Sequence, residues 1–355
     1  MANKVKFSND GNYVSYVERG PVNNIIDLVP PQFDNAYDDY AKVVLLDSYC
    51  MLFPEANTDN KPVMYFRHTD VAKNKFRFGN IVDLGDEPLQ VQKGVLHEDE
   101  SADSDSVIDV PYGKYCDDSN VLCFKSTGKV EQFYYPDKTT IKEGDYLNLT
   151  AYPWEGFTTY DHQSTYENCS CVFQPATFMG VLDGKPVIGL GSYDRLCMKQ
   201  NAFGGFGTVS LSYIAFSAMG IRKDGRKEYC FASIGLSDGA RTIATYQIDG
   251  ESPIVCDKVE FEADWIKLPY VNDGTCVFKD AVLYFGGKEF HFEGKWGTKG
   301  FLKEPRIEKH GQSQMFGKWY EGNEKYEHRL YYTFTENMEA YEDNLRKLGY
   351  NVIGV

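Results

Sequence analysis

The chain has 355 residues, with 37 Lys and Arg against 52 Asp and Glu, which gives a formal net charge of −15. This excess of acid argues against a surface for nucleic acid or anionic membranes, because phosphate binding needs clustered cations. With 42% hydrophobic and 25% charged residues, the composition is that of a globular protein and excludes a disordered or collagen-like chain. The length predicts two domains, or one large all-β domain.

The first twelve residues contain no apolar signal-peptide core, and no run of 18 apolar residues occurs in the chain. We therefore expect a cytoplasmic protein without membrane contact, whose oligomeric state stays open. The nine cysteines have no paired CxxC spacing, which predicts reduced, mostly buried thiols. Cys169 and Cys171 share one face of a predicted strand with no His nearby, so we expect no metal site there.

Asp-Gly pairs and strand-like runs alternate along the chain, a pattern typical of antiparallel β-structure. The pairs begin at Asp10, Asp183, Asp224, Asp238, Asp249 and Asp273. The runs cover residues 40–53, 62–66, 121–124, 169–182, 187–190, 209–221, 228–234, 242–248, 254–261 and 276–285. Many of the 26 Tyr and 23 Phe fit half-buried strands or the walls of an apolar pocket.

Helical spacing is found near the end of the chain. Thr335 is the predicted N-cap, Tyr341 and Leu345 lie on the apolar face, and Gly349 ends the helix.

Two ten-residue segments resemble each other. Residues 61–70 and 185–194 both begin Lys-Pro-Val and both have Asp nine residues after the Lys. Duplication of a β unit and chance both explain four shared positions. If the unit is duplicated, Arg67 and His68 precede Asp70 as the equivalents of residues ahead of Asp194, and they are candidates to face a ligand cavity.

Familiar cofactor and catalytic motifs are missing from the sequence. It has no phosphate loop, no HExxH, no GxSxG, and no GxGxxG between a strand and a helix. The glycine-rich residues 201–207 lead into a predicted strand, where no helix N-terminus would hold a phosphate. We therefore expect no nucleotide cofactor.

The most informative stretch, residues 173–195, predicts a hairpin that turns at Asp183-Gly184. Its second strand delivers Tyr193, Asp194 and Arg195 together. The pattern of a small-residue strand, DGKPV and GxGxxD[RH] resembles the central motif of the carotenoid 1,2-hydratase and AttH-like superfamily. Residues 218–226 and 312–319 are similar to segments that follow this motif in relatives of unknown function.

This resemblance, over about residues 165–320, implies two lipocalin-like antiparallel β-barrels and a cofactor-free pocket for a lipophilic small molecule. We place the barrels at residues 1–195 and 196–355, the second with the terminal helix. The chain departs from the family where x-Trp-Gly usually follows, since it has Leu196, Cys197 and Met198. Related proteins include hydratases and cyclases, so fold does not choose the reaction.

Four residues are candidates for catalysis. A carboxylic acid at Asp194 would protonate an alkene or enone, His162 or Tyr193 would assist, and Arg195 would orient the substrate or stabilise an anion. The alternative for Asp194 and Arg195 is a structural ion pair. Further pocket residues suggested by the motif context are Gln174, Trp319 and Glu321, for which core packing or solvent exposure is the alternative. The remaining histidines, His328 among them, are expected at the surface.

Three functions compete at this point. The first is cofactor-independent hydration, isomerisation or cyclisation of an unsaturated or aromatic lipophile by acid and base groups. The second is a carrier or sensor of an apolar molecule with no chemistry. The third is a carbohydrate-active propeller or sandwich, drawn from Trp154 and the many Tyr and acids.

Overall fold

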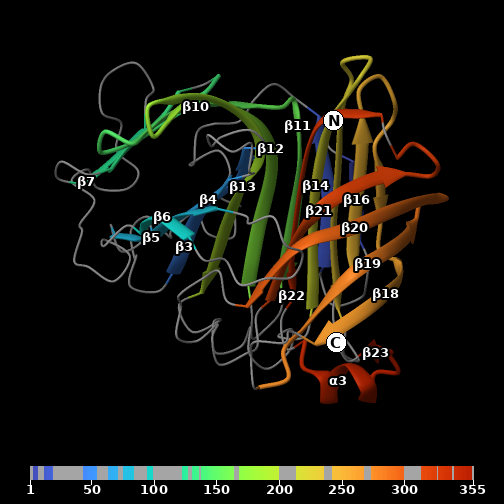
Figure 1. Cartoon of the computed structure of the whole chain (residues 1–355). Helices are drawn as coiled ribbons and strands as arrows, with labels where there is room; N and C mark the ends of the chain where they lie inside the picture. Colours follow the sequence, from blue (N-terminus) through green and yellow to red (C-terminus); the bar gives the residue numbers. More distant parts are fainter. Residues whose placement is uncertain are drawn as a thin grey trace. The chain divides into compact units, whose positions relative to one another are not determined.

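In a computed structural model, the described part of the chain is almost entirely β-structure (Figure 1). The structure describes residues 3–6, 12–18, 43–53, 63–70, 75–83, 94–98, 122–126, 130–135, 137–163, 168–199, 213–235, 242–267, 273–299, 313–325, 327–337 and 340–353. The described elements fall into two units, one within Met1–Leu84 and Gly94–Gly205 and the other within Phe206–Val355. The all-β prediction is thereby confirmed.

Unit 1 is a 13-stranded sheet in which all described pairs are antiparallel. Its strands are β1 (Asn3–Lys6), β2 (Asn12–Glu18), β3 (Val43–Phe53), β4 (Val63–Asp70), β5 (Lys75–Asp83), β6 (Gly94–Glu98), β7 (Leu122–Ser126), β8 (Val130–Tyr134), β9 (Thr139–Glu143), β10 (Leu147–Pro153), β11 (Gly156–Gln163), β12 (Asn168–Leu182) and β13 (Lys185–Lys199). The main path runs β6-β5-β4-β3-β13-β12-β10-β9-β8-β7. The long β12–β13 hairpin therefore lies at the middle of the sheet.

The β12–β13 hairpin turns where the sequence predicted. Leu182 pairs with Lys185, which leaves Asp183 and Gly184 as a two-residue loop. Both have positive φ, 49° and 74°, as a type I′ turn requires. The turn sets the register of the whole hairpin, and with it the neighbours of Asp194.

Burial alternates toward the turn of the hairpin, so the two faces of this part of unit 1 can be told apart. Gln174, Ala176 and Phe178 are fully buried, whereas Met179 and Val181, further along β12 and on the other face, are exposed. Strand residues alternate between faces. We call the face of Gln174, Ala176 and Phe178 the inner face, and the opposite one the outer face.

Unit 2 is a 10-stranded sheet, ordered β17-β16-β15-β14-β22-β21-β20-β19-β18-β23. Its elements are β14 (Tyr213–Arg222), β15 (Lys227–Gly235), β16 (Ile243–Ile248), β17 (Ile254–Cys256), β18 (Glu260–Lys267), β19 (Cys276–Phe285), β20 (Lys288–Lys299), β21 (Ser313–Glu321), β22 (His328–Asn337), α3 (Glu342–Lys347) and β23 (Val352–Ile353). β23 is parallel to β18, and the other described pairs are antiparallel.

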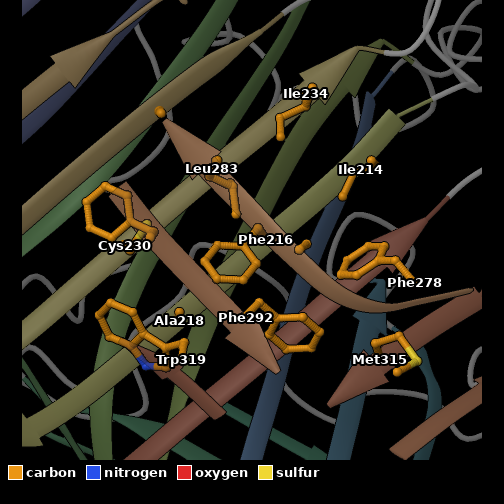
Figure 2. Close-up of a cluster of buried hydrophobic side chains, with 14 of the residues drawn as sticks. Ile214, Phe216, Ala218, Cys230, Ile234, Phe278, Leu283, Phe292, Met315 and Trp319 are labelled. Atoms are coloured by element: carbon orange, nitrogen blue, oxygen red, sulfur yellow. The ribbon is translucent and has the colours of Figure 1, made fainter. Parts of the chain in front are cut away.

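The sheet of unit 2 curls around an aromatic core. The rings of Tyr246 on β16 and Phe290 on β20 lie 4.9 Å apart, although four strands separate β16 from β20 in the sheet. Phe216 and Phe292 meet edge to face at 5.9 Å, and Phe278 joins them (Figure 2). Strands so far apart in one sheet can touch only if the sheet rolls up, so unit 2 has the barrel-like form that the sequence predicted.

Two local predictions were wrong. The run 254–261 is not one strand, because β17 ends at Cys256 and β18 begins at Glu260, on the opposite side of the sheet order. Thr335 is not a helix cap, because it pairs with Phe216 within β22. The helix begins after Tyr341, and Gly349, with φ 87°, follows its end as expected.

Two large sheets also contradict the propeller, which is built from four-stranded blades. β13 passes through residues 195 and 196 to Lys199, and the proposed division there stays a prediction. In the described part of the chain, no helix has the length and apolar character of a membrane span.

Candidate functional site

Strand register brings most of the predicted site residues of unit 1 into neighbouring rows. Asp194 on β13 pairs with Ser48 on β3, and Ser48 pairs with His68 on β4. Residues directly opposite in antiparallel strands share a face, with Cβ atoms about 4.5–5.5 Å apart. Asp194, Ser48 and His68 thus occupy consecutive register positions on three neighbouring strands, and Ser48 is a residue that the sequence had not singled out.

A second row lies on the other face of the same strands. Gln174 pairs with Tyr193, Tyr193 with Tyr49, and Tyr49 with Arg67. Gln174 is fully buried, so this row belongs to the inner face. Because neighbouring residues of a strand alternate, Asp194 and His68 occupy outer-face positions.

Arg195 follows Asp194 in β13 and returns to the inner face. It pairs with Asp47 on β3, which is an opposite-charge pair in register. Tyr193 and Arg195 therefore occupy inner-face positions, and Asp194 between them occupies an outer-face position.

His162 is further from Asp194 than its predicted role requires. It pairs with Cys169, and Cys169 pairs with Met198. Asp194 is four residues before Met198 in β13, a separation of about 13 Å along the strand. His162 shares the outer face with Asp194 but not its row, and its catalytic role stays a prediction.

The Gln174 side chain is well placed and incompletely bonded. Its Nε2 donates to the carbonyl oxygen of Trp154 at 3.4 Å, and Trp154 in turn donates its indole N–H to Thr177 at 3.0 Å. The Oε1 of Gln174, fully buried, has no hydrogen-bond partner among the described residues. An unpaired buried acceptor of this kind costs about 1–3 kcal/mol of stability.

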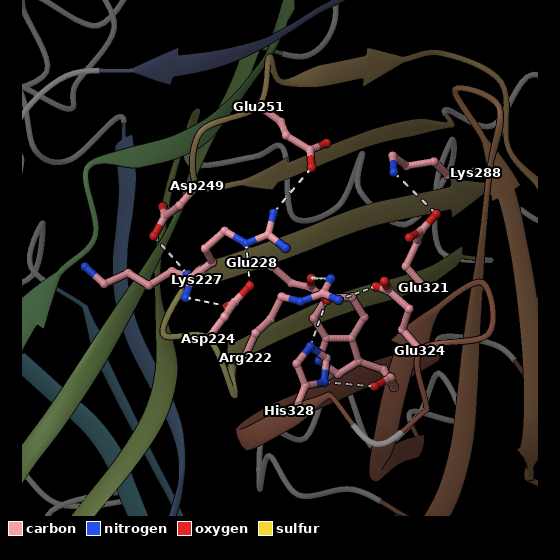
Figure 3. A network of polar contacts seen from close by, with 12 residues as sticks. Arg222, Asp224, Lys227, Glu228, Asp249, Glu251, Lys288, Glu321, Glu324 and His328 are labelled. Carbon is pink, nitrogen blue, oxygen red and sulfur yellow. Dashed lines mark hydrogen bonds and ion pairs between the residues drawn. The ribbon is translucent and has the colours of Figure 1, made fainter.

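Unit 2 contains a buried polar network that the sequence did not reveal (Figure 3). Arg222 Nη1 lies 3.0 Å from Glu228 Oε2, and Arg222 Nη2 lies 2.5 Å from Glu324 Oε2. His328 Nε2 lies 2.7 Å from Glu228 Oε1, and its Nδ1 lies 3.2 Å from the carbonyl oxygen of Trp319. The side chains of Arg222, Glu228 and His328 are 8%, 1% and 8% exposed, so the expected surface position of His328 was wrong.

The groups of this network satisfy one another. Burial lowers the pKa of the Arg222 guanidinium, but its hydrogen bond to Glu324 and the charge of Glu228 outweigh this and leave the pKa raised. Both ring nitrogens of His328 face acceptors inside the protein. With neither nitrogen available to a substrate, the network fits a structural role at one end of the unit 2 core better than a catalytic one.

Trp319 and Glu321 are in unit 2. Trp319 is 1% exposed and donates its indole N–H to the carbonyl oxygen of Met219 at 2.8 Å. Glu321 is half-buried and pairs with Lys288 at 3.3 Å. That Trp319 and Glu321 contact a ligand stays a prediction. In the structure Trp319 is a core residue and Glu321 is part of an ion pair.

The described part of the chain contains no group of three or more His, Cys, Asp or Glu arranged to hold a metal ion. The described thiols of Cys230, Cys256 and Cys276 are free.

Comparison with known proteins finds similar chains among the solved structures. No protein-family model and no curated protein matches the chain. A putative AttH from Nitrosomonas europaea is similar at 13% identity, with 88% of this chain and 99% of that one covered and a TM-score of 0.45. Kievitone hydratase from Nectria haematococca is similar at 11% identity, with coverage of 91% and 96% and a TM-score of 0.42. A protein named CghA is similar at 10% identity, with coverage of 93% and 99% and a TM-score of 0.34.

An AttH-type protein and a hydratase, the kinds of protein whose motif the residues around Asp194 resemble, are among the solved structures to which the chain is similar. At identities of 10 to 13%, what the chain does has to be argued from its own residues.

Proposed function

We propose that the chain converts a lipophilic unsaturated or aromatic small molecule by proton transfer, without a redox cofactor, on the outer face of unit 1. The observation that carries the proposal is the row Asp194, Ser48 and His68 on β13, β3 and β4. Acid-base chemistry needs a proton donor and a proton acceptor at fixed positions, and this row supplies both.

The surroundings of this row favour a site with little water. Leu190 and Ser192 precede Asp194 on the same face, and Thr158 lies in its row beyond Phe173. Leu190, Ser192 and Thr158 are each 1% exposed or less. Exclusion of water strengthens electrostatic interactions and protects a cationic or enolic intermediate from side reactions.

In the proposed reaction, Asp194 donates its proton to one carbon of the substrate double bond. His68 removes a proton from water, whose oxygen bonds to the neighbouring carbon, so that water adds across the bond. The hydroxyl of Ser48 then passes the proton from the His68 imidazolium back to the Asp194 carboxylate. If His68 removes a proton from the substrate instead of from water, the same groups catalyse isomerisation or cyclisation.

In this proposal His68 has the role of catalytic partner to Asp194 that the sequence predicted for His162 or Tyr193. The register separates His162 from Asp194 by about 13 Å along the strand and gives Tyr193 the opposite face. Arg195, opposite Asp47, would then support the sheet from the inner side.

The test begins with the compound that the protein carries from its host, identified by native mass spectrometry and organic extraction. Turnover of that compound is then measured for the unmodified chain, Asp194→Asn, Ser48→Ala and His68→Gln. Asp183→Asn, in the exposed turn of the same hairpin, is the matched control. We expect Asp194→Asn to lower kcat at least about 100-fold while ligand affinity changes little.

Labelling with H₂¹⁸O distinguishes the reactions, because only hydration places the label in the product. Unchanged turnover in Asp194→Asn would contradict the assignment of the acid. A bound compound that the unmodified protein returns intact after prolonged incubation would instead favour the alternative function, a carrier or sensor.

A further inference from the structure

The Asp-Gly turns of the chain differ in how their carboxylates are held. The structure describes four of them, at Asp183, Asp224, Asp249 and Asp273, and all four aspartates are exposed. In an Asp-Gly pair the side-chain carboxyl group can reach the nitrogen of the next residue easily, because glycine has no Cβ to block the approach. Since exposure and the following residue are the same at these turns, hydrogen bonds are what distinguishes them.

Hydrogen bonds hold the carboxylate in every described Asp-Gly turn except that of Asp183. Asp224 and Asp273 each accept from the backbone N–H of the residue two positions further on, at 3.0 and 3.1 Å, as in an Asx turn. The side chain of that residue adds a second bond, at 2.8 Å to Asp224 and at 2.7 Å to Asp273. Asp249 Oδ2 accepts from the backbone N–H of Lys227 on β15 at 2.9 Å (Figure 3). These bonds must break before the carboxyl group can turn toward the glycine nitrogen.

The carboxylate of Asp183 is not held in this way. Among the described residues, none forms a hydrogen bond or ion pair with it, and its backbone N–H donates to the carbonyl oxygen of Tyr146. Gly184 is exposed, and no atom lies within 4 Å of the position that a Cβ would take there. After Asp224, by contrast, the glycine N–H donates to the carbonyl oxygen of Arg222 at 3.0 Å. The turn of Asp183 therefore leaves the carboxyl group free to rotate, with open space around the glycine.

We propose that Asp183 is a site of spontaneous modification, at which the folded chain forms a succinimide and then isoaspartate in preference to the other described Asp-Gly turns. The nitrogen of Gly184 attacks Cγ of the protonated Asp183 carboxyl group. The N–Cγ bond forms, and the amide proton leaves with the carboxyl hydroxyl group as water. Another water then opens the ring. Attack at Cγ restores aspartate, whereas attack at the α-carbonyl carbon breaks its bond to the nitrogen and gives isoaspartate.

This modification changes the turn that sets the register of the β12–β13 hairpin. The loop between Leu182 and Lys185 has only two residues, and the isoaspartyl linkage adds one methylene group to its backbone. The linkage also leaves a free α-carboxylate at residue 183. An isoaspartyl methyltransferase acts on this group by moving a methyl group from the sulfonium of S-adenosylmethionine to a carboxylate oxygen. Asp183 is thus also the proposed recognition site for an enzyme of that class.

Ageing of the folded chain tests the proposal directly. The full chain is incubated at mildly acidic pH under conditions where far-UV circular dichroism shows it folded, and is then digested. Isoaspartyl peptides are quantified by mass spectrometry after chromatography and identified by labelling with isoaspartyl methyltransferase and S-adenosylmethionine. We expect at least about 10-fold more isoaspartate at Asp183 than at Asp224, Asp249 or Asp273, because these must first give up a hydrogen bond to a charged oxygen.

Unfolding and two substitutions separate the effect of structure from that of sequence. In guanidinium chloride the turns lose their hydrogen bonds, so we expect conversion at all of them to agree within about 3-fold. Arg226→Ala removes the side-chain bond to Asp224 Oδ2 and should raise conversion at Asp224 about 3-fold in the folded chain. Asp183→Glu is the matched control, because glutamate cannot close the same ring, and it should leave conversion at Asp224 unchanged.

Equal conversion at the described turns of the folded chain would overturn the proposal. So would a preference for Asp183 that persists in guanidinium chloride, because it would then come from the sequence alone. Unchanged conversion at Asp224 in Arg226→Ala would contradict the role given to the hydrogen bonds. None of these outcomes depends on turnover at Asp194. Asp183→Asn closes the same ring with loss of ammonia, so as a control for turnover it is used freshly purified.

Discussion

Substitution of Gly220 tests how tightly the buried network of unit 2 is built. A Cβ atom at residue 220 would lie 2.3 Å from Nε2 and 2.4 Å from Cδ2 of His328, whereas ordinary contacts begin at 3.4 Å. The ring would have to retreat by about 1.1 Å, the difference between 3.4 and 2.3 Å. The same nitrogen bonds to Glu228 at 2.7 Å, so a direct retreat would stretch that contact to about 3.8 Å, beyond hydrogen-bonding distance.

Because Glu228 is buried, moving the His328 ring away from it lowers the stability of the protein. Glu228 is 2% exposed and would keep only Arg222 as a charged partner. Loss of one partner from a buried charged network typically costs about 3–5 kcal/mol. Because Arg222 remains, we expect Gly220→Ala to lower the free energy of unfolding by about 3 kcal/mol.

A double-mutant cycle identifies the cause. His328→Ala removes the ring, so Gly220→Ala should cost less than about 1 kcal/mol in that background, a coupling of about 2 kcal/mol. Urea unfolding of the full chain, followed by tryptophan fluorescence, measures each variant, with Lys223→Ala at an exposed position of the next turn as control. Additive effects of Gly220→Ala and His328→Ala would refute the reasoning, because the clash would then not lie with the ring.

Two further predictions concern unit 2. Burial raises the pKa of the Cys276 thiol to about 12 from a usual 9.0, and the thiol donates a hydrogen bond to the Gly274 carbonyl oxygen. The folded state therefore holds this proton more tightly than the unfolded state does. The contribution of Cys276 to the free energy of unfolding is complete below pH 9 and is lost as the pH rises toward 12. Urea unfolding of the unmodified chain and of Cys276→Ala at pH 8 and about pH 10.5 should show a smaller pH-dependent loss in the variant, and equal losses would contradict this. Gly317→Ala would place its Cβ 2.0 Å from the carbonyl oxygen of Glu293 in β20, a backbone atom that cannot rotate away, so it should lower the free energy of unfolding by about 2 kcal/mol or more. Lys318→Ala, exposed on the same strand, should change it by less than about 0.5 kcal/mol, and similar values for the two variants would argue against the close approach of β20 and β21.

Local signals in the sequence were sufficient to predict single hairpins. Asp183-Gly184 forms a two-residue turn because both residues adopt positive φ, which is a preference of the residues themselves. The Thr335 cap failed for the opposite reason. Thr335 pairs with Phe216, far away in the sequence, and this tertiary pairing overrides the local capping preference.

The candidate site depended on contacts that no local pattern specifies. Asp194 and Arg195 are evident as charged residues at a strand, but register alone puts Ser48 and His68 in the row of Asp194. The same limit applies to unit 2, where His328 meets Glu228 from 100 residues away. A histidine in a charged stretch of sequence is normally exposed, and only the fold reveals that the side chain of His328 is buried.

The short strand β23 has a consequence for how the protein behaves in solution. Val352 and Ile353 pair in parallel with Trp265 and Ile266 of β18, and Arg346 of α3 donates to the Val352 carbonyl oxygen at 2.8 Å. An uncovered strand at a sheet margin is a template on which other chains can add and aggregate. These two residues, held by Arg346 of α3, thus cover the margin of β18, and the resistance of the chain to aggregation depends in part on them.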